Sequence, residues 1–206
     1  MNPPVMYHDG SRGLQDRFSS RRLADRLVDV LARSEFNDAD RSFIESRSMF
    51  FLSTADASGH PDCSYKGGLP GFVRVLDSRT LAFPSYDGNG MFKSLGNLVV
   101  NPWVGMLFID FETPKRLRVN GRASMRDDDP LLGEFPGAQL IVRVQPEAIF
   151  PNCPRYIHTM KVVEESVYAP REGHVAPSPA WKQRPEFREV LPPDRPGSTA
   201  NAPGER

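Results

Sequence analysis

The sequence has 206 residues, of which 39% are hydrophobic and 25% charged, a composition typical of one globular domain with appendages rather than of a disordered or membrane chain. Its 26 basic residues balance its 26 acidic ones, so no net positive charge attracts nucleic acid or an anionic membrane. The first residues contain no apolar signal-peptide core, and no run of about 18 apolar residues occurs, so we expect a cytoplasmic protein that binds neither nucleic acid nor membrane.

We expect residues 1–36 to form a helical extension at the N-terminus. Apolar residues recur at helical spacing, between arginines and aspartates, over residues 17–33, which is typical of an amphipathic helix. A second helix is predicted to begin after Asn37 or Asp38, because either side chain is a good N-cap. This second helix leads into the main domain, which we place at residues 37–168.

The main domain predicts strands separated by turns. Residues 56–59 are expected to form a hairpin turn in which Gly59 takes positive φ, and residues 91–100 a short helix that ends at Asn101-Pro102. The pattern is typical of a mainly β fold with flanking helices, a six- or seven-stranded antiparallel barrel. The strands are expected at residues 50–54, 62–66, 72–76, 80–83, 103–111, 117–124 and 139–145.

The C-terminal segment, residues 169–206, has a different character. Eight of the 20 prolines lie between Pro170 and Pro203, a spacing that leaves no room for a packed helix or sheet. We therefore expect an extended arm that docks on a partner subunit through Trp181 and Phe187. The last dozen residues are expected to be disordered.

The segment from residue 83 to residue 97 is a candidate anion site. A strand is predicted to end at Phe83, a glycine-rich turn follows, and a helix then starts with Lys93 and Ser94 in its first turn. Free N–H groups and the helix dipole favour an anion there, and the lysine adds a positive charge. The alternative is a glycine-rich turn that only reverses the chain.

Two further segments add positive charge. Over residues 116–122 the polar residues alternate with apolar ones and so share one face of a strand; they are Arg116, Arg118, Asn120 and Arg122. Such a face either meets an anion or lies in solvent. Residues 63–68 place a serine and Lys66 beside two glycines, which either admit a flat ligand or mark a bulged strand. Cys63 in this segment is expected to be a small buried residue.

Two long blocks give the sequence a resemblance to a known family. FIESRSMFFLSTADASGHPDCSYKGGLPGFVRVLD and TLAFPSYDGNGMFKSLGNLVVNPWVGMLFIDFETPKRLRVNGRA resemble, in this order, the split-barrel flavoproteins related to pyridoxamine 5′-phosphate oxidase. The flanks YHDGSRGLQDRF and IFPNCPRYIH resemble an uncharacterised branch of that family, so the similarity covers residues 7–167. The resemblance implies an FMN-binding split barrel that forms a homodimer with the cofactor at the interface. It also implies oxidation or reduction of a small organic molecule, with NAD(P)H as a candidate electron donor.

The resemblance also implies a set of cofactor-binding positions. In the family, the FMN phosphate is held by basic and hydroxyl groups on the strands and on the loop before the short helix. The matching phosphate and ribityl positions are Lys66, Ser85, Lys93 and Ser94, while Ser64, Tyr65, Pro84 and Tyr86 would border the isoalloxazine ring. Arg116 and Arg118 fall where a family strand reaches the cofactor, from the same or the other subunit, and Arg74 belongs to either group.

The substrate is less defined. Arg155, Tyr156 and His158 are substrate-pocket candidates, and the alternative is a helical turn packed on the barrel. The sequence has no counterpart of the C-terminal Arg-x-Arg element of the true pyridoxamine phosphate oxidases, which argues against vitamin B6 as substrate. A non-catalytic FMN store or sensor, and a barrel that uses a deazaflavin or haem, therefore stay open. The four histidines lack ligand spacing, so no metal site is expected.

Overall fold

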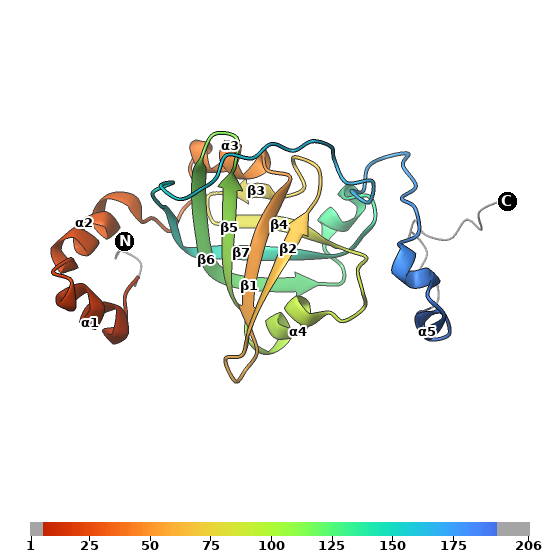
Figure 1. Cartoon of the computed structure of the whole chain (residues 1–206), viewed down its shortest axis with the longest axis horizontal. Coiled ribbons are helices and arrows are strands. Elements are labelled where there is room, and N and C mark those ends of the chain that lie inside the picture. Colours follow the sequence, from red (N-terminus) through yellow and green to blue (C-terminus); the bar gives the residue numbers. More distant parts are fainter. Residues whose placement is uncertain (1–5, 193–206) are drawn as a thin grey trace.

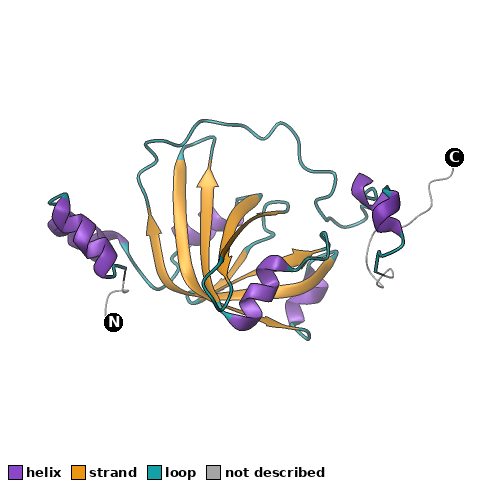
Figure 2. Ribbon diagram, turned by 60° about the horizontal axis from the view of Figure 1, so that its bottom comes forward, coloured by secondary structure: helices purple, strands orange, loops and turns teal. Residues whose placement is uncertain are grey.

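The computed structural model describes residues 6–192, and its centre is one seven-stranded antiparallel sheet (Figure 1). The strand order is β2-β1-β5-β6-β7-β4-β3, so β2 and β3 are the two edges of a sheet that curves around its core without closing (Figure 2). This confirms the predicted split barrel with flanking helices. The strands are β1 (Met49–Ala55), β2 (Pro61–Gly67), β3 (Arg74–Asp77), β4 (Thr80–Tyr86), β5 (Trp103–Asp110), β6 (Lys115–Arg126) and β7 (Ala138–Pro151).

Alternating side chains define an inner and an outer face of the sheet. In β6, Leu117 and Val119 are buried while Arg118 and Asn120 are exposed, as the period of two requires. The inner face carries the core, in which the Phe50 ring centroid lies 5.0 Å from that of Phe83 and 5.2 Å from that of Phe108. Burial of these large apolar side chains is the main force that holds the sheet in its curved shape around the core.

Several strand boundaries differ from the prediction: β4 continues past Phe83, the predicted strand end, to Tyr86, and two further differences have a clear structural cause. β3 begins at Arg74 rather than at residue 72, because Phe72 and Val73 are buried in the core but precede the ladder. β7 continues past residue 145 to Pro151, and Pro146 is tolerated because it lies at a bulge opposite Gly121. A Cβ on Gly121 would lie 2.1 Å from the Gln145 carbonyl oxygen, so only glycine fits there.

The N-terminal extension is a hairpin of two helices, α1 (Asp9–Arg17) and α2 (Arg21–Leu31). The single helix predicted over residues 17–33 is therefore wrong at its start, because the chain reverses at Ser19, which has φ 54°. Both views show the hairpin beside the sheet rather than packed across it (Figures 1 and 2). Its apolar residues Leu23 and Val30 are exposed.

Two short helices cover the sheet. In α3 (Asp38–Glu45), Asn37 is the N-cap and forms a reciprocal capping box with Asp40, which confirms the predicted start and satisfies N–H groups that the helix itself leaves free. This helix contacts β3. The second helix, α4 (Lys93–Val100), packs against β1 and β2. No helix within residues 6–192 is long and apolar enough to cross a membrane.

The C-terminal segment is irregular from residue 152 but contains two short helices, η2 (Ala180–Gln183) and α5 (Pro185–Arg188). The expectation of a wholly extended arm is wrong at these turns, because a proline at the first position of a helix costs no hydrogen bond. The rings of Trp181 and Phe187 pack edge to face, 6.0 Å apart. The last dozen residues, which are expected to be disordered, lie outside the described part of the chain.

Candidate functional site

The predicted anion site is the glycine-rich connection from β4 to α4. Gly90 has φ 74° and Phe92, the N-cap of α4, has φ 48°, so the backbone turns sharply before the helix. The side chain of Asn89 accepts a hydrogen bond of 3.0 Å from the Met91 N–H. The helix then starts at Lys93, which is exposed and has no acidic neighbour in the first turn. The predicted placement of Lys93 and Ser94 in the first turn of this helix is confirmed.

A polar network joins the start of α4 to β2. The Ser94 hydroxyl lies 2.9 Å from the Ser64 hydroxyl and donates to an Asp62 carboxylate oxygen 2.9 Å away. Lys66 follows on the same face of β2, where burial lowers its pKa and the nearby Asp62 carboxylate opposes that shift. Sequence reasoning missed Asp62, although its spacing of two residues from Ser64 and four from Lys66 places all three on one strand face.

A second group of predicted residues lies at the opposite edge of the sheet. Arg74 on β3 forms an ion pair of 2.5 Å with Glu134 and lies over the Phe135 ring, 4.2 Å from its centroid. Glu134 is the last residue of the short helix η1 (Pro130–Glu134), and Phe135 directly follows it. Tyr86 is near Arg74, and burial raises the pKa of its phenol to about 12 while the arginine opposes the shift.

The remaining β4 positions differ in accessibility. Pro84 is buried and pairs with Ile141 of β7, whereas Ser85 is partly exposed beside the bulge that precedes Tyr86. Pro84 therefore supports the sheet, and Ser85 is the more accessible of the two to a bound molecule.

Strand alternation separates Tyr65 from its neighbours Ser64 and Lys66. Tyr65 is exposed, and its ring makes an edge contact with Phe51 of β1, 6.3 Å between centroids. Ser64 and Lys66 pair with Leu52 and Phe50, which are core residues. Tyr65 therefore lies on the outer face of the sheet, the face that also carries Arg116 and Arg118.

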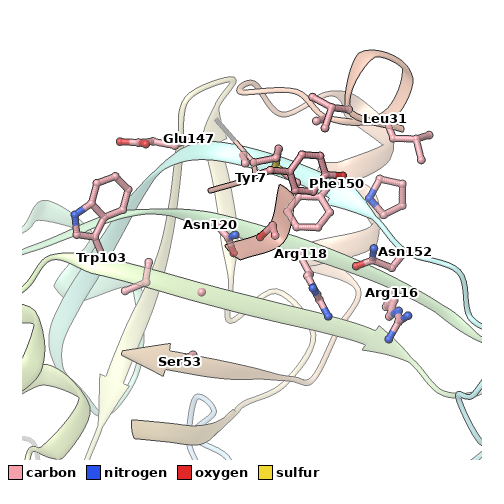
Figure 3. A pocket seen from close by; sticks show the side chains of 18 of the residues that line it. Tyr7, Leu31, Ser53, Trp103, Arg116, Arg118, Asn120, Glu147, Phe150 and Asn152 are labelled. Atoms are coloured by element: carbon pink, nitrogen blue, oxygen red, sulfur yellow. The ribbon is translucent and has the colours of Figure 1, made fainter. Parts of the chain in front are cut away.

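A groove of about 1190 Å³ lies between this outer face and the helical hairpin (Figure 3). Its lining includes Tyr7, Leu31, Arg116, Arg118, Asn120 and Asn152. The β6–β7 ladder ends with the pair Leu117 and Pro151. Arg116 precedes Leu117 and Asn152 follows Pro151 on the antiparallel partner strand, so the two residues lie side by side. The Nε atom of Arg116 and the Oδ1 atom of Asn152 are buried and have no hydrogen-bond partner within the described residues.

The cationic face predicted for β6 is confirmed, but its arginines differ in their surroundings. Arg118 lies over the Phe150 ring at 5.9 Å and Arg122 over the Trp103 ring at 5.2 Å. Aromatic contacts of this kind hold a guanidinium in a fixed place without neutralising it. Sequence reasoning missed Asn152, because its role depends on β7 extending past the bulge.

The structure does not bring the predicted substrate residues to the groove. Arg155, Tyr156 and His158 lie in the irregular segment after β7 and are exposed, Tyr156 at 85% of its surface. The chain makes a turn there, in which the Ile157 N–H donates to the Pro154 carbonyl oxygen at 2.8 Å. Cys153 does line the groove. Cys63 is on β2 as expected but exposed, because the odd-numbered positions of this strand face outward.

The fold of this chain is a seven-stranded antiparallel split barrel with flanking helices. The chain belongs to the pyridoxamine 5′-phosphate oxidase family, whose model matches residues 36–160. The matched segment starts after the helical hairpin and stops before the C-terminal arm, so both extensions lie outside it.

Solved structures of similar fold come from several bacteria. They include HupZ of Group A Streptococcus (18% identity over 56% of this chain and 93% of that one, TM-score 0.46) and the haem storage protein HutZ of Vibrio cholerae (25%, 53% and 90%, 0.40). An FMN-binding protein of Syntrophomonas wolfei matches 68% of this chain and 98% of its own at 14% identity and TM-score 0.41. No curated protein matches the chain significantly.

Proposed function

We propose that this protein is a homodimeric FMN-dependent oxidoreductase that acts on a small organic molecule. The observation that carries the proposal is the cradle at the start of α4, where hydroxyls of Ser64 and Ser94 meet at 2.9 Å beside Lys66 and Lys93. A dianionic phosphate is the group that backbone N–H and ammonium donors at a helix start recognise best.

The cradle fits the phosphate with a defined division of labour. Because the Ser94 hydroxyl already donates to Asp62, its role is to fix the helix start against β2. The free backbone N–H groups and the Lys93 ammonium would meet the phosphate directly. Lys66 offsets the Asp62 carboxylate, which would otherwise repel an anion.

The arginines of β6 fit the other end of the cofactor, but not within one chain. Ser64 and Lys66 are on the inner face of the sheet and Arg116 and Arg118 on the outer face. One flavin cannot contact both sets in a single subunit. A dimer in which each cradle meets the outer face of the partner would join them, and this supports the homodimer and the use of both chains at each site.

FMN, when bound, would supply the chemistry of hydride transfer between a donor such as NAD(P)H and the substrate. The protein's own residues would bind and orient. Arg116, which lines the groove, would donate a hydrogen bond to the ring edge and stabilise negative charge there. Lys93 would hold the phosphate end. This division of roles requires no nucleophile from the protein.

The test is the absorbance spectrum of the purified protein, together with the mass of any extracted cofactor and an FMN titration of the apoprotein. We expect the absorbance bands of an oxidised flavin and micromolar or tighter binding. A Soret band, or the mass of a deazaflavin, would contradict FMN as the cofactor. Bound FMN that no NAD(P)H reduces, and whose reduced form no substrate panel reoxidises, would instead favour a non-catalytic store or sensor.

A further inference from the structure

The C-terminal arm touches the sheet at the residue where the glycine-rich loop begins. Asp87 is the first residue after β4, and one of its carboxylate oxygens accepts a bond of 2.7 Å from the Lys182 ammonium of η2. The other oxygen accepts a bond of 3.3 Å from the Gln139 amide of β7. The side chain of Lys182 is only 19% exposed, so this is a partly sheltered contact across 95 residues of sequence.

A second contact holds the same arm at the same end of the sheet. Ala169, where the arm begins, is buried. The ring of Pro170 packs on Gly137, with its Cβ 3.5 Å from the position that a Cβ on this glycine would take. Because Tyr86 pairs with Ala138, Gly137 and Asp87 are neighbours at the end of the β4–β7 ladder. The two contacts of the arm therefore flank the point where β4 continues into the loop.

The other end of the loop is fixed independently. Ser94 is buried and joined to Asp62 and Ser64 of β2. Between the two fixed ends, residues 88–92 are all exposed. They include Phe92, whose backbone is in the left-handed region. This conformation costs a non-glycine residue free energy and persists only where the surrounding structure holds it.

We propose that Lys182 is a positioning residue, and that the arm latches the glycine-rich loop in the shape that presents its N–H groups to an anion. The family model ends at residue 160, so Lys182 lies outside the matched segment. Lys182 acts through Asp87 and does not itself touch the bound group. The inference rests on the proposed FMN site for its consequence, but not for its geometry.

The first experiment measures hydrogen exchange of residues 87–92 in the full-length protein without cofactor. A partly exposed ion pair stabilises by a modest amount, so Lys182→Ala should speed exchange there about two- to fivefold. Lys182→Arg should keep the wild-type rate. The matched control is Arg188→Ala, which removes a cation of the same arm. Among residues 6–192 its side chain bonds to the Gln183 carbonyl oxygen alone, so its loss should leave the loop unchanged.

Charge exchange separates the ion pair from a general loss of packing. Asp87→Lys alone should speed exchange as Lys182→Ala does, and adding Lys182→Asp should bring the rate back toward wild type. Wild-type exchange in Lys182→Ala would overturn the proposal, as would a double variant no slower than Asp87→Lys.

The second experiment titrates the same variants with FMN. We expect Lys182→Ala to weaken FMN binding about two- to fivefold, more at low than at high salt, with Arg188→Ala unchanged. If wild-type protein binds FMN and Lys182→Ala binds it equally well, the positioning role is refuted while the proposed function stands. If wild-type protein binds no FMN, the proposed function fails, and the exchange data alone decide whether the latch exists.

Discussion

At the scale of single residues, Lys93 and Arg116 have distinct predicted roles. Lys93→Ala removes one charge-assisted contact to a phosphate dianion and should weaken FMN binding by about 1.5 to 3 kcal/mol, or roughly 10- to 150-fold. The flavin midpoint potential should stay the same, because the phosphate is distant from the ring. Fluorescence titration and spectroelectrochemistry measure the two quantities. Lys161→Ala, an exposed cation of the irregular segment, is the control, and wild-type affinity in Lys93→Ala would contradict the site.

Arg116→Ala should act on the other property. If this guanidinium meets the ring edge, its loss weakens binding and also lowers the midpoint potential, because the anionic reduced flavin loses a neighbouring cation. Arg122→Ala is the matched control on the same strand face, since Arg122 lies over Trp103 and does not line the groove. A potential that shifts equally in both variants would argue against a specific role for Arg116.

At the scale of elements, Asp129 joins η1 to β7. Its carboxylate accepts two hydrogen bonds from Arg143, of 2.5 and 2.9 Å, and one from the Leu131 N–H. The Arg143 bonds hold the pKa of Asp129 below its ordinary value, although burial opposes the shift. The run of three aspartates at residues 127–129 predicts a solvated turn that caps the next segment. The cap is confirmed, whereas Asp129 itself is buried.

The sign of the pH effect follows from that direction. A carboxylate with a lowered folded-state pKa stabilises the protein above its unfolded pKa, and the contribution is lost as pH falls through the folded value. Asp129→Asn should therefore cost about 1.5 to 3 kcal/mol at neutral pH, and the difference from wild type should shrink below about pH 4. Urea unfolding of both proteins at neutral pH and below about pH 4 measures this difference in the free energy of unfolding. Asp128→Asn, at an exposed ion pair, should change little at either pH.

The bulge between β6 and β7 tests the extended strand. Gly121→Ala places a Cβ against the Gln145 backbone and should destabilise the fold by about 1 to 3 kcal/mol or more, since backbone cannot yield as a flexible side chain does. The matched control is Gly133→Ala, because no atom of the described residues lies within 4 Å of the position that its Cβ would take. Equal unfolding midpoints for the two variants would show that the bulge is not as tight as described.

At the scale of the whole molecule, the opposite placement of the two cationic groups predicts subunit complementation. Light scattering should report twice the mass of the chain. When Lys93→Ala and Arg116→Ala subunits are mixed and refolded, a mixed dimer has one site with both groups intact and one with neither. A fraction of sites should therefore regain wild-type FMN affinity. If mixing restores wild-type affinity at no site, Lys93 and Arg116 either bind one cofactor within the same subunit or bind different ligands.

The sequence by itself determined the local structure of this protein. Alternation set the faces of β6, Asn37 set the start of α3, and the glycine-rich turn set the start of α4 to within two residues of Lys93. These are interactions between near neighbours, which spacing and side-chain chemistry specify directly. The same periodicity placed Arg116 and Arg118 on one face.

Only the tertiary structure decided which of these residues meet. The Ser64–Ser94 and Lys182–Asp87 contacts join segments 30 and 95 residues apart, and no local pattern selects such partners. The reversal at Ser19 and the continuation of β7 through Pro146 oppose intrinsic preference, and long-range strand pairing at the bulge accommodates the proline. The separation of the two cationic groups onto opposite faces is likewise a property of the curved sheet. It depends on which face of each strand the apolar core occupies, and that core is assembled from every strand at once.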